Sequence, residues 1–228
     1  MFNIKKHIPN TITCCNLISG CTATYYAFRS DFDIALLFII IGAVFDFFDG
    51  MSARLLKVSS PIGKELDSLA DDITFGFAPS AVVFSYLCGF HIHCPFVPFL
   101  TFIMAAFSAL RLAKFNLDER QALGFIGLPT PANALFWGSL IVALEQKGIT
   151  FCGMEWVILL GVLISSYLLV AEIPMFALKF KHWGWKGNEV KYIFILSCIP
   201  LLLLFGIGAF AVIIAWYVIL SVATKKEN

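Results

Sequence analysis

Six acidic residues lie in stretches of sequence that are otherwise apolar. They are Asp46, Asp49, Asp67, Asp71, Asp72 and Glu172. A charged side chain at the centre of a bilayer costs at least about 2.5 kcal/mol on insertion scales, so each of these acids needs a cation, a partner or a function. All but Glu172 fall between residues 46 and 72, near the ends of two successive apolar stretches. This concentration of carboxylates predicts a chemical site.

The spacing of four of these acids predicts two pairs of carboxylates. Residues three or four positions apart share a face of a helix, so Asp46 lies beside Asp49, and Asp67 beside Asp71. Four neighbouring carboxylates repel one another unless cations neutralise them, and ligand sets made only of oxygen select hard ions. We therefore expect two divalent cations, Mg²⁺ or Mn²⁺, held by all four aspartates.

The residues between the two pairs are suited to a phosphate-containing ligand. Gly50 and Ala53 leave a bare helix surface that a flat or bulky ligand can approach, and Gly63 does the same on the next helix. Arg54 offers a planar guanidinium that suits a phosphate. Together these features favour a diphosphate attached to a lipid. The simpler alternative is that the acids form salt bridges with three nearby bases, Arg54, Lys57 and Lys64.

The composition places these residues in a membrane protein. Of 228 residues, 60% are hydrophobic and 14% are charged, whereas soluble domains average about 45–50% and 25%. At about 20 apolar residues per crossing, the sequence predicts an all-α, polytopic integral membrane helix bundle with about eight transmembrane helices. The expected helices are 11–28, 33–53, 66–90, 95–116, 130–146, 154–177, 190–206 and 208–223.

We expect residues 1–228 to form a single membrane domain, with a core at about 8–177 and an extra helical hairpin at about 190–223. The uncharged stretch 192–223 also permits one long tilted helix, which would give seven spans. Gly206 and Gly208 at its centre favour the hairpin.

The distribution of basic residues predicts the orientation. With eight spans, every Lys and Arg except Arg29 and Lys147 falls on one side of the membrane. The positive-inside rule then places both termini and the carboxylates in the cytoplasm. The first apolar run has no small-residue cleavage site, so it is expected to stay as a helix rather than to be removed as a signal peptide. The net charge of +1 gives no reason to expect a nucleic acid partner.

Residues 46–71 carry a recognisable pattern of residue types. They read Asp-Phe-Phe-Asp-Gly-Met-Ser-Ala-Arg, then eight residues, then Gly-Lys-Glu-Leu-Asp-Ser-Leu-Ala-Asp. This pattern resembles the signature of the CDP-alcohol phosphatidyltransferase family at all eight of its defined positions. The resemblance implies transfer of a phosphatidyl group from CDP-diacylglycerol to a small alcohol, with release of CMP.

The resemblance also implies roles for individual residues. Asp46, Asp49 and Asp67 would hold the metals, and Asp71, also near a metal, would be the catalytic base. Asn10 and Thr13 recur at helical spacing and are candidates for the nucleotide, although hydrogen bonding between helices is an alternative. The set expected to bind the nucleotide and CDP-diacylglycerol is Asp49, Gly50, Ala53, Arg54, Gly63, Asp67, Asn10 and Thr13.

Further segments resemble the branch of the family that uses serine, the CDP-diacylglycerol–serine O-phosphatidyltransferases. These segments are 8–20, 67–79, 110–116 and 127–132. A departure is Asp72, where an apolar residue is expected. The branch implies L-serine as the acceptor and phosphatidylserine as the product, and the family resemblance implies a homodimer. A cytoplasmic active site with positive-inside loops suits a bacterial inner membrane, and an organelle membrane is the alternative.

A serine acceptor carries a carboxylate, so its pocket needs a cation. Arg111 and Lys114 are the candidates, and the alternative for both is that they anchor the helix at the membrane surface.

Three other functions are consistent with parts of the pattern. The same chemistry with glycerol 3-phosphate or inositol stays open, although a phosphorylated acceptor calls for a denser basic cluster than Arg111 and Lys114. A membrane prenyltransferase also uses aspartate-rich motifs with magnesium. A cation- or proton-coupled transporter would need its acids staggered across the bilayer, whereas here they gather at one face.

Overall fold

The computed structural model describes residues 7–90, 94–117, 125–176, 184–185 and 188–224 of the chain. In these residues the helices are α1 (His7–Phe28), α2 (Phe32–Leu56), α3 (Pro61–Asp71), α4 (Ala78–Cys88), α5 (Ile103–Leu117), α6 (Thr130–Gln146), α7 (Met154–Val170), α8 (Glu189–Phe205) and α9 (Ala209–Ala223). Strands β1 (Phe125–Ile126) and β2 (Pro174–Met175) form a two-residue antiparallel pairing. The predicted all-α fold class is confirmed.

Three short elements connect or extend these helices. A π-helix (Asp72–Phe77) joins α3 to α4, so that one uninterrupted helical segment runs over residues 61–88. A 3₁₀-helix (Val97–Phe102) leads into α5, and a second one (Gly206–Gly208) joins α8 to α9. Each of the eight expected apolar runs therefore corresponds to one helical segment.

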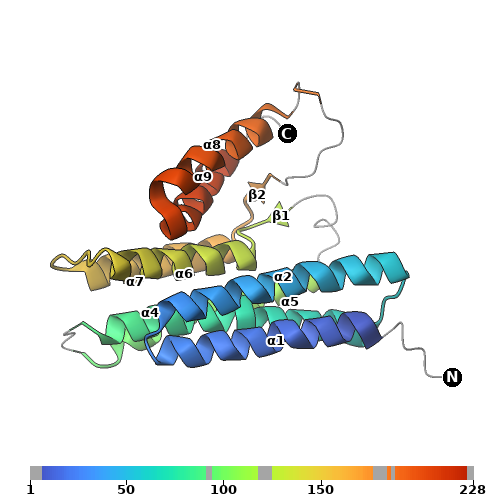
Figure 1. Cartoon of the computed structure of the whole chain (residues 1–228), viewed down its shortest axis with the longest axis horizontal. Coiled ribbons are helices and arrows are strands. Elements are labelled where there is room, and N and C mark those ends of the chain that lie inside the picture. Colours follow the sequence, from blue (N-terminus) through green and yellow to red (C-terminus); the bar gives the residue numbers. More distant parts are fainter. Residues whose placement is uncertain (1–6, 91–93, 118–124, 177–183, 186–187, 225–228) are drawn as a thin grey trace.

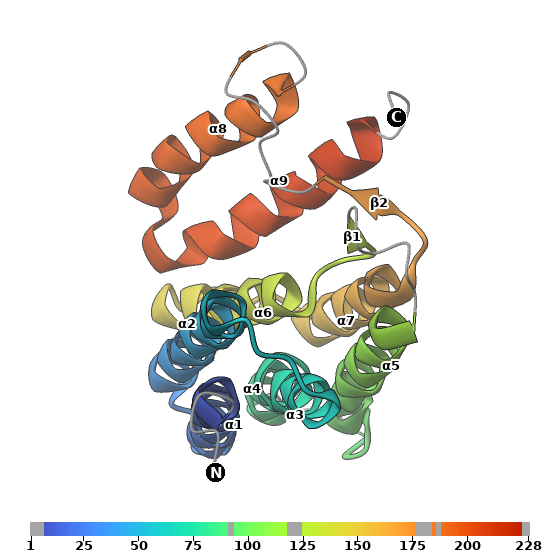
Figure 2. The same cartoon turned by 90° about the vertical axis from the view of Figure 1, so that its right-hand side faces the viewer.

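Within the part of the chain that the structure describes, three helical stretches are long and apolar enough to cross a membrane: Phe32–Leu56, Val97–Leu117 and Glu189–Ala223. The third is broken at Gly206, whose backbone has a φ of 56°, a conformation that glycine adopts without strain. Figures 1 and 2 show α8 and α9 folded back on each other, so the hairpin replaces the single long helix. The membrane helix bundle is confirmed, whereas the number of eight spans stays a prediction.

Two helix ends differ from the expected ones for local reasons. The helix expected from residue 66 begins at Pro61, because Ser60 caps it by accepting a hydrogen bond from the backbone N–H of Gly63. Because this first turn contains polar residues, a search for apolar runs does not detect it. The helix expected to reach residue 177 ends at Val170, because Ala171 is extended and Pro174 lies in β2.

Helices α1 to α7 lie side by side along a common direction, and the α8–α9 hairpin is inclined over the face formed by α6 (Figures 1 and 2). The connections that carry Arg29 and Lys147 lie at one end of this bundle, and the ends of α2 and α5 lie at the other. Arg29 and Lys147 therefore lie at the end of the bundle opposite to Arg54 and Lys114, which are in the last turns of α2 and α5 (Figure 1).

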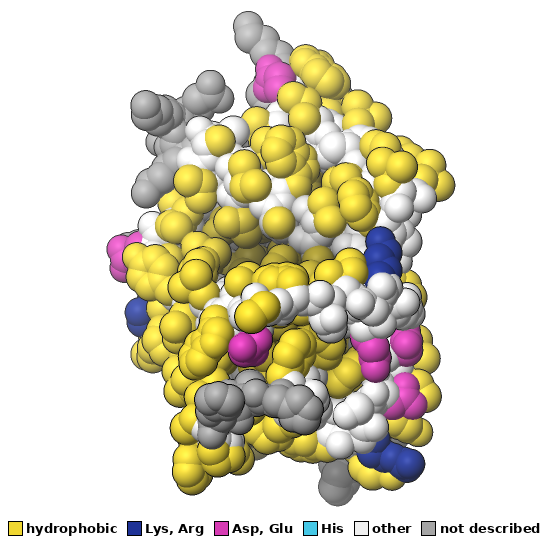
Figure 3. Space-filling model, turned by 90° about the vertical axis from the view of Figure 1, so that its left-hand side faces the viewer, with side chains coloured by type: hydrophobic (Ala, Val, Ile, Leu, Met, Phe, Trp, Pro, Cys, Tyr) yellow, Lys and Arg dark blue, Asp and Glu magenta, His cyan; other side chains and the backbone are white. Residues whose placement is uncertain are grey.

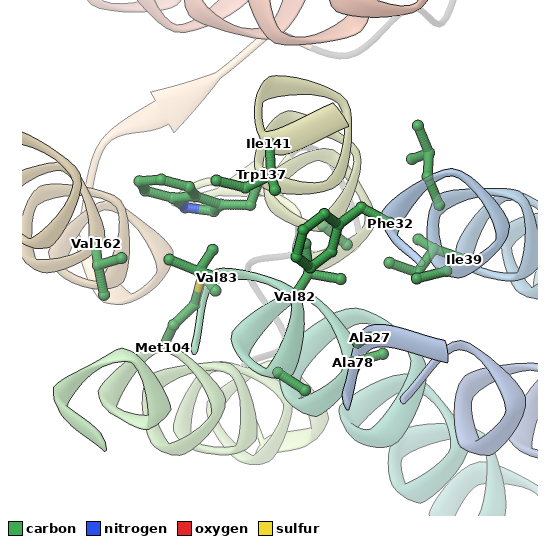
Figure 4. Close-up of a cluster of buried hydrophobic side chains, with 14 of the residues drawn as sticks. Ala27, Phe32, Ile39, Ala78, Val82, Val83, Met104, Trp137, Ile141 and Val162 are labelled. Carbon is green, nitrogen blue, oxygen red and sulfur yellow. The ribbon is translucent and has the colours of Figure 1, made fainter. Parts of the chain in front are cut away.

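The core lies between α2, α4, α5, α6 and α7. Phe32, Val82, Trp137 and Val162 are among its buried side chains (Figure 4). Trp137 Nε1 also donates a hydrogen bond of 2.9 Å to Ser165 Oγ, which links α6 to α7. Outside this core, hydrophobic side chains cover much of the surface, as Figure 3 shows for one end of the molecule. This distribution suits a bundle surrounded by lipid.

Thr74 of the π-helix brings the third helical segment against α1 and α2. Its Oγ1 donates a hydrogen bond of 3.1 Å to the backbone carbonyl of Asn16. Gly20 on α1 and Gly42 on α2 face Thr74 so closely that a Cβ atom at either position would collide with it. Because small residues allow helices to approach, these two glycines set the spacing between the helices that carry the aspartates.

We expect Gly20→Val to destabilise the protein by about 1–3 kcal/mol, because the added side chain overpacks the contact with Thr74. The measurement is the thermal unfolding midpoint in detergent. Cys21→Val is the control, since Cys21 is the next residue on α1 and is exposed. Equal midpoints for the two variants would contradict this view of the contact.

Candidate metal and nucleotide site

Carboxylates of α2 and α3 meet beside α1, which contacts both helices. One oxygen from each of Asp46, Asp49 and Asp67 can be chosen so that all three lie within 4.8 Å of one another. Among the described residues, no lysine or arginine forms an ion pair with any of the three. Oxygen-only donors at this spacing fit a hard divalent cation. The three aspartates are therefore able to hold a metal ion.

Helix α1 orients two of the aspartates through hydrogen bonds. Thr13 Oγ1 donates to Asp49 Oδ2 at 2.7 Å, and Asn16 Nδ2 donates to Asp71 Oδ1 at 3.1 Å. Both Thr13 and Asn16 are buried. Partners of this kind fix the orientation of carboxylates at a metal site. Thr13 therefore makes a hydrogen bond between helices and, through the same bond, holds an aspartate of the site.

Asp71 lies beside the group of three but is not part of it. It is buried, and it interacts electrostatically with Asp46, Asp67 and Asp49. Asp72, the next residue, turns toward α5, where it lies close to Ser108. Because successive residues of a helix point in different directions, the two neighbouring acids lie on different sides of the segment, and only Asp71 faces the other aspartates.

The nearby bases do not neutralise the carboxylates. Lys64 Nζ donates a hydrogen bond of 2.8 Å to the backbone carbonyl of Asn116 on α5. Lys57 ends α2 in a left-handed backbone conformation, and its side chain is exposed. Arg54 is exposed as well. Salt bridges to these bases, the simpler alternative considered for the sequence, do not account for the cluster.

A cavity of about 360 Å³ opens beside the carboxylates. Its lining comes from α1, α2 and the start of α3: Pro9, Asn10, Thr13, Asp49, Gly50, Ala53, Val58, Ser59, Ser60, Gly63, Lys64 and Asp67. Every residue expected to bind the nucleotide is in this set except Arg54. The structure thus brings together seven positions that come from three separate stretches of sequence.

The two glycines of the cavity differ in what surrounds them. A Cβ atom at Gly50 would meet nothing within 4 Å, whereas one at Gly63 would lie 2.9 Å from Asn10 Oδ1 and 3.0 Å from Ser60 Oγ. Gly50 therefore keeps the cavity open, and Gly63 allows α1 to approach the first turn of α3. The N-terminus of α3 also faces the cavity, and helix N-termini favour anionic ligands.

Val58, Ser59 and Ser60 line the cavity but were not among the predicted site residues. They precede α3, whose expected start was five positions too late. The sequence Ser60-Pro61 is a typical helix start and could have located both the cap and this wall of the cavity.

The two basic residues that are candidates for binding the acceptor, Arg111 and Lys114, are in different environments. Arg111 is buried, with 6% of its surface exposed, and it interacts electrostatically with Asp71. Its Nε has no hydrogen-bond partner among the described residues. Lys114 is exposed. Because a buried guanidinium nitrogen without a hydrogen-bond partner is costly, Arg111 is the better candidate of the two for an anionic ligand.

Comparison with known proteins identifies the class. The chain matches the family model of CDP-alcohol phosphatidyltransferase over residues 6–178. It therefore belongs to the CDP-alcohol phosphatidyltransferase family, and the family that the aspartate signature predicts is confirmed.

The names of individual relatives are more specific than the name of the family. The chain is similar to CDP-diacylglycerol–serine O-phosphatidyltransferase of Bacillus subtilis (strain 168), with 36% identity over 179 residues that cover 78% of this chain and 92% of the relative. It is 30% identical over 228 residues to the protein of that name from Helicobacter pylori (strain ATCC 700392 / 26695), covering 94% of this chain and 89% of the relative. A Mycobacterium leprae (strain TN) protein with the same name is 30% identical over 175 residues, which cover 74% of this chain and 57% of the relative.

We expect Asp46→Asn, Asp49→Asn and Asp67→Asn each to weaken Mn²⁺ binding at least about tenfold, because each removes a charged ligand from the group of three. Electron paramagnetic resonance of free Mn²⁺ in a titration of the purified protein measures this directly. Asp33→Asn is the matched control, since Asp33 also lies on α2 but is exposed and accepts a hydrogen bond from Gln146. Unchanged Mn²⁺ affinity in the three variants would contradict the site.

Proposed function

We propose that this chain transfers the phosphatidyl group of CDP-diacylglycerol to the hydroxyl of L-serine, giving phosphatidylserine and CMP. The observation that carries the proposal is the three-aspartate group beside a cavity lined by the predicted nucleotide residues. The names of the similar bacterial proteins support the choice of serine. When bound, the two proposed divalent cations, Mg²⁺ or Mn²⁺, would neutralise the diphosphate and stabilise charge on the departing CMP.

The cavity between α1, α2 and α3 is the proposed site for the cytidine diphosphate. Its volume of about 360 Å³ is within the usual range for small-ligand pockets. Gly50 and Ala53 let the nucleotide approach α2, and Asn10 offers an amide for hydrogen bonding. The N-terminus of α3 lies at this cavity, where the positive end of the helix dipole would favour the phosphates. Arg54, exposed and outside this lining, is proposed to act only at the edge of the site.

Asp71 is the proposed general base. The serine hydroxyl oxygen would attack the phosphorus that bears diacylglycerol, the bond from that phosphorus to the bridging oxygen would break, and CMP would leave. The proton of the hydroxyl would pass to an Asp71 carboxylate oxygen. Asn16 holds Asp71 by its Oδ1, which leaves the other oxygen available to accept the proton.

Arg111 is the proposed partner of the serine carboxylate. It is buried and interacts with Asp71, so a carboxylate bound to its guanidinium would place the serine hydroxyl toward that aspartate. Lys114 is exposed and is better suited to the membrane surface.

The remaining expectations extend this proposal. We propose that the protein is in the bacterial inner membrane, with both termini and the active site in the cytoplasm. The separation of Arg29 and Lys147 from the other described bases supports that orientation. The homodimer that the family resemblance implies stays a prediction.

We expect purified protein in detergent with Mn²⁺ or Mg²⁺ to release CMP from CDP-diacylglycerol when L-serine is present, and EDTA to abolish the release. Asp71→Asn should lower kcat by about 10²–10⁴, the usual contribution of a general base. The measurement is CMP formation with serine, glycerol 3-phosphate, inositol or no acceptor.

Release with a different alcohol would keep the family and overturn serine as the substrate. An unchanged kcat in Asp71→Asn would show that Asp71 is not the general base. Metal-dependent chemistry that CMP does not inhibit would favour a prenyltransferase instead.

We expect Arg111→Gln to raise the KM for serine at least about tenfold, because a charged hydrogen bond to the carboxylate is lost. Lys114→Gln should leave that KM within about twofold, since the Lys114 side chain is exposed. Both variants should retain the KM for CDP-diacylglycerol. If the serine KM rises in Lys114→Gln and not in Arg111→Gln, Lys114 rather than Arg111 binds the serine carboxylate.

A further inference from the structure

The α8–α9 hairpin lies beyond residues 6–178, which are the part of the chain matched by the family model. It contacts the core near both ends of α6. Gly208 lies so close to α6 that a Cβ atom there would be 2.9 Å from the Cβ of Ala143. The Tyr217 hydroxyl on α9 donates a hydrogen bond of 2.9 Å to the backbone carbonyl of Phe176, next to β2. The hairpin is therefore attached to the core at two separate places.

An apolar cavity of about 490 Å³ lies where α9 faces α6 and α7 (Figure 2). Its lining is largely aliphatic and aromatic, with Trp137 on α6, Ile158 on α7 and Ile214 on α9. Protein interiors are close-packed and hold few voids larger than a water molecule. This volume is instead within the usual range for small-ligand pockets. The cavity is therefore suited to an apolar ligand.

The length of the cavity matches one acyl chain. Asn133 and Leu144 are the first and last residues of α6 that line it. They lie eleven residues apart, which is about 16 Å of helix at 1.5 Å per residue. The hydrocarbon core of a bilayer is about 30 Å thick, so this length is close to the depth of one leaflet. An acyl chain of a membrane lipid has this reach.

The rim of the cavity faces outward, whereas its floor is buried. Val157 and Ile164 on α7 and Ile219 on α9 line the cavity and are exposed on the surface of the bundle. Trp137 and Ile158 line it as well and are buried. In a membrane the exposed side chains contact lipid. A chain can therefore enter sideways from the bilayer, between α7 and α9.

Asn133 gives the cavity a polar end. Its side chain is fully buried, and neither Oδ1 nor Nδ2 has a hydrogen-bond partner among the described residues. A buried amide without partners is costly. In a glycerolipid, an ester carbonyl that can accept a hydrogen bond is directly attached to the acyl chain. An apolar lining with an amide at one end thus suits a chain esterified to glycerol better than it suits a plain hydrocarbon.

We propose that this cavity binds one acyl chain of a phospholipid from the surrounding bilayer, with the ester toward Asn133, and that the bound lipid fastens the hairpin to the core. Each methylene group that the cavity buries adds to the affinity. The cavity shares no lining residue with the one beside the aspartates, which comes from α1, α2 and α3. The lipid is therefore a resident of the fold rather than the substrate, and the inference goes beyond the proposed function.

The test is photolabelling of the purified full chain in detergent with a phosphatidylcholine that carries a diazirine in one acyl chain. We expect peptide mass spectrometry to find adducts on Trp137 and Ile158, because these buried side chains are reached only from within the cavity. Val218→Trp should lower this labelling at least about tenfold. The larger side chain fills part of the cavity, and the displacement of two methylene groups is enough for a tenfold loss of affinity.

Val222→Trp is the matched control, since it is the same substitution one turn further along α9, at an exposed residue outside the lining. It should be labelled like the unmodified protein. Ala215→Phe is a second cavity-filling variant from the same helix, and it should lower the labelling as Val218→Trp does.

Three outcomes would overturn the inference. The first is adducts confined to exposed residues such as Val157 and Ile219, which lipid around the outside of the protein also reaches. The second is labelling of Trp137 and Ile158 that stays unchanged in both cavity-filling variants, or that falls equally in Val222→Trp. The third is displacement of the label by CDP-diacylglycerol but not by unlabelled phosphatidylcholine, which would assign the cavity to the substrate. None of these results depends on CMP release, so the proposed function is tested separately.

Discussion

Repulsion among Asp46, Asp49 and Asp67 is the constraint on which the rest of the structure depends. Their carboxylate oxygens gather within 4.8 Å, at the edge of a bundle whose surface is largely apolar. In such surroundings the repulsion is weakly screened. Among the described residues no base pairs with them, so a bound cation would stabilise the arrangement. The chain keeps them together for chemistry rather than for stability.

The fold holds this cluster by close contact between helices. Thr74 packs against Gly20 and Gly42, which draws the segment bearing Asp67 and Asp71 toward α1 and α2. Thr13 and Asn16 then hold two of the carboxylates by hydrogen bonds.

The proposed donor and acceptor halves of the site come from different parts of the bundle. The cavity beside the aspartates comes from α1, α2 and α3, whereas Arg111 comes from α5. Under the proposed function, one set of helices would recognise the nucleotide and another would recognise the acceptor.

The sequence by itself determined the fold class, the helix order and the aspartate cluster, because apolar length and helical spacing are local properties. It also identified most of the cavity, since the signature lies in one short window. Only the tertiary structure separated Arg111 from Lys114, excluded salt bridges with Arg54, Lys57 and Lys64, and placed Asn16 against Asp71. These outcomes depend on burial and on contacts between helices that are distant in the sequence. The spacing of residues along the chain does not predict such contacts.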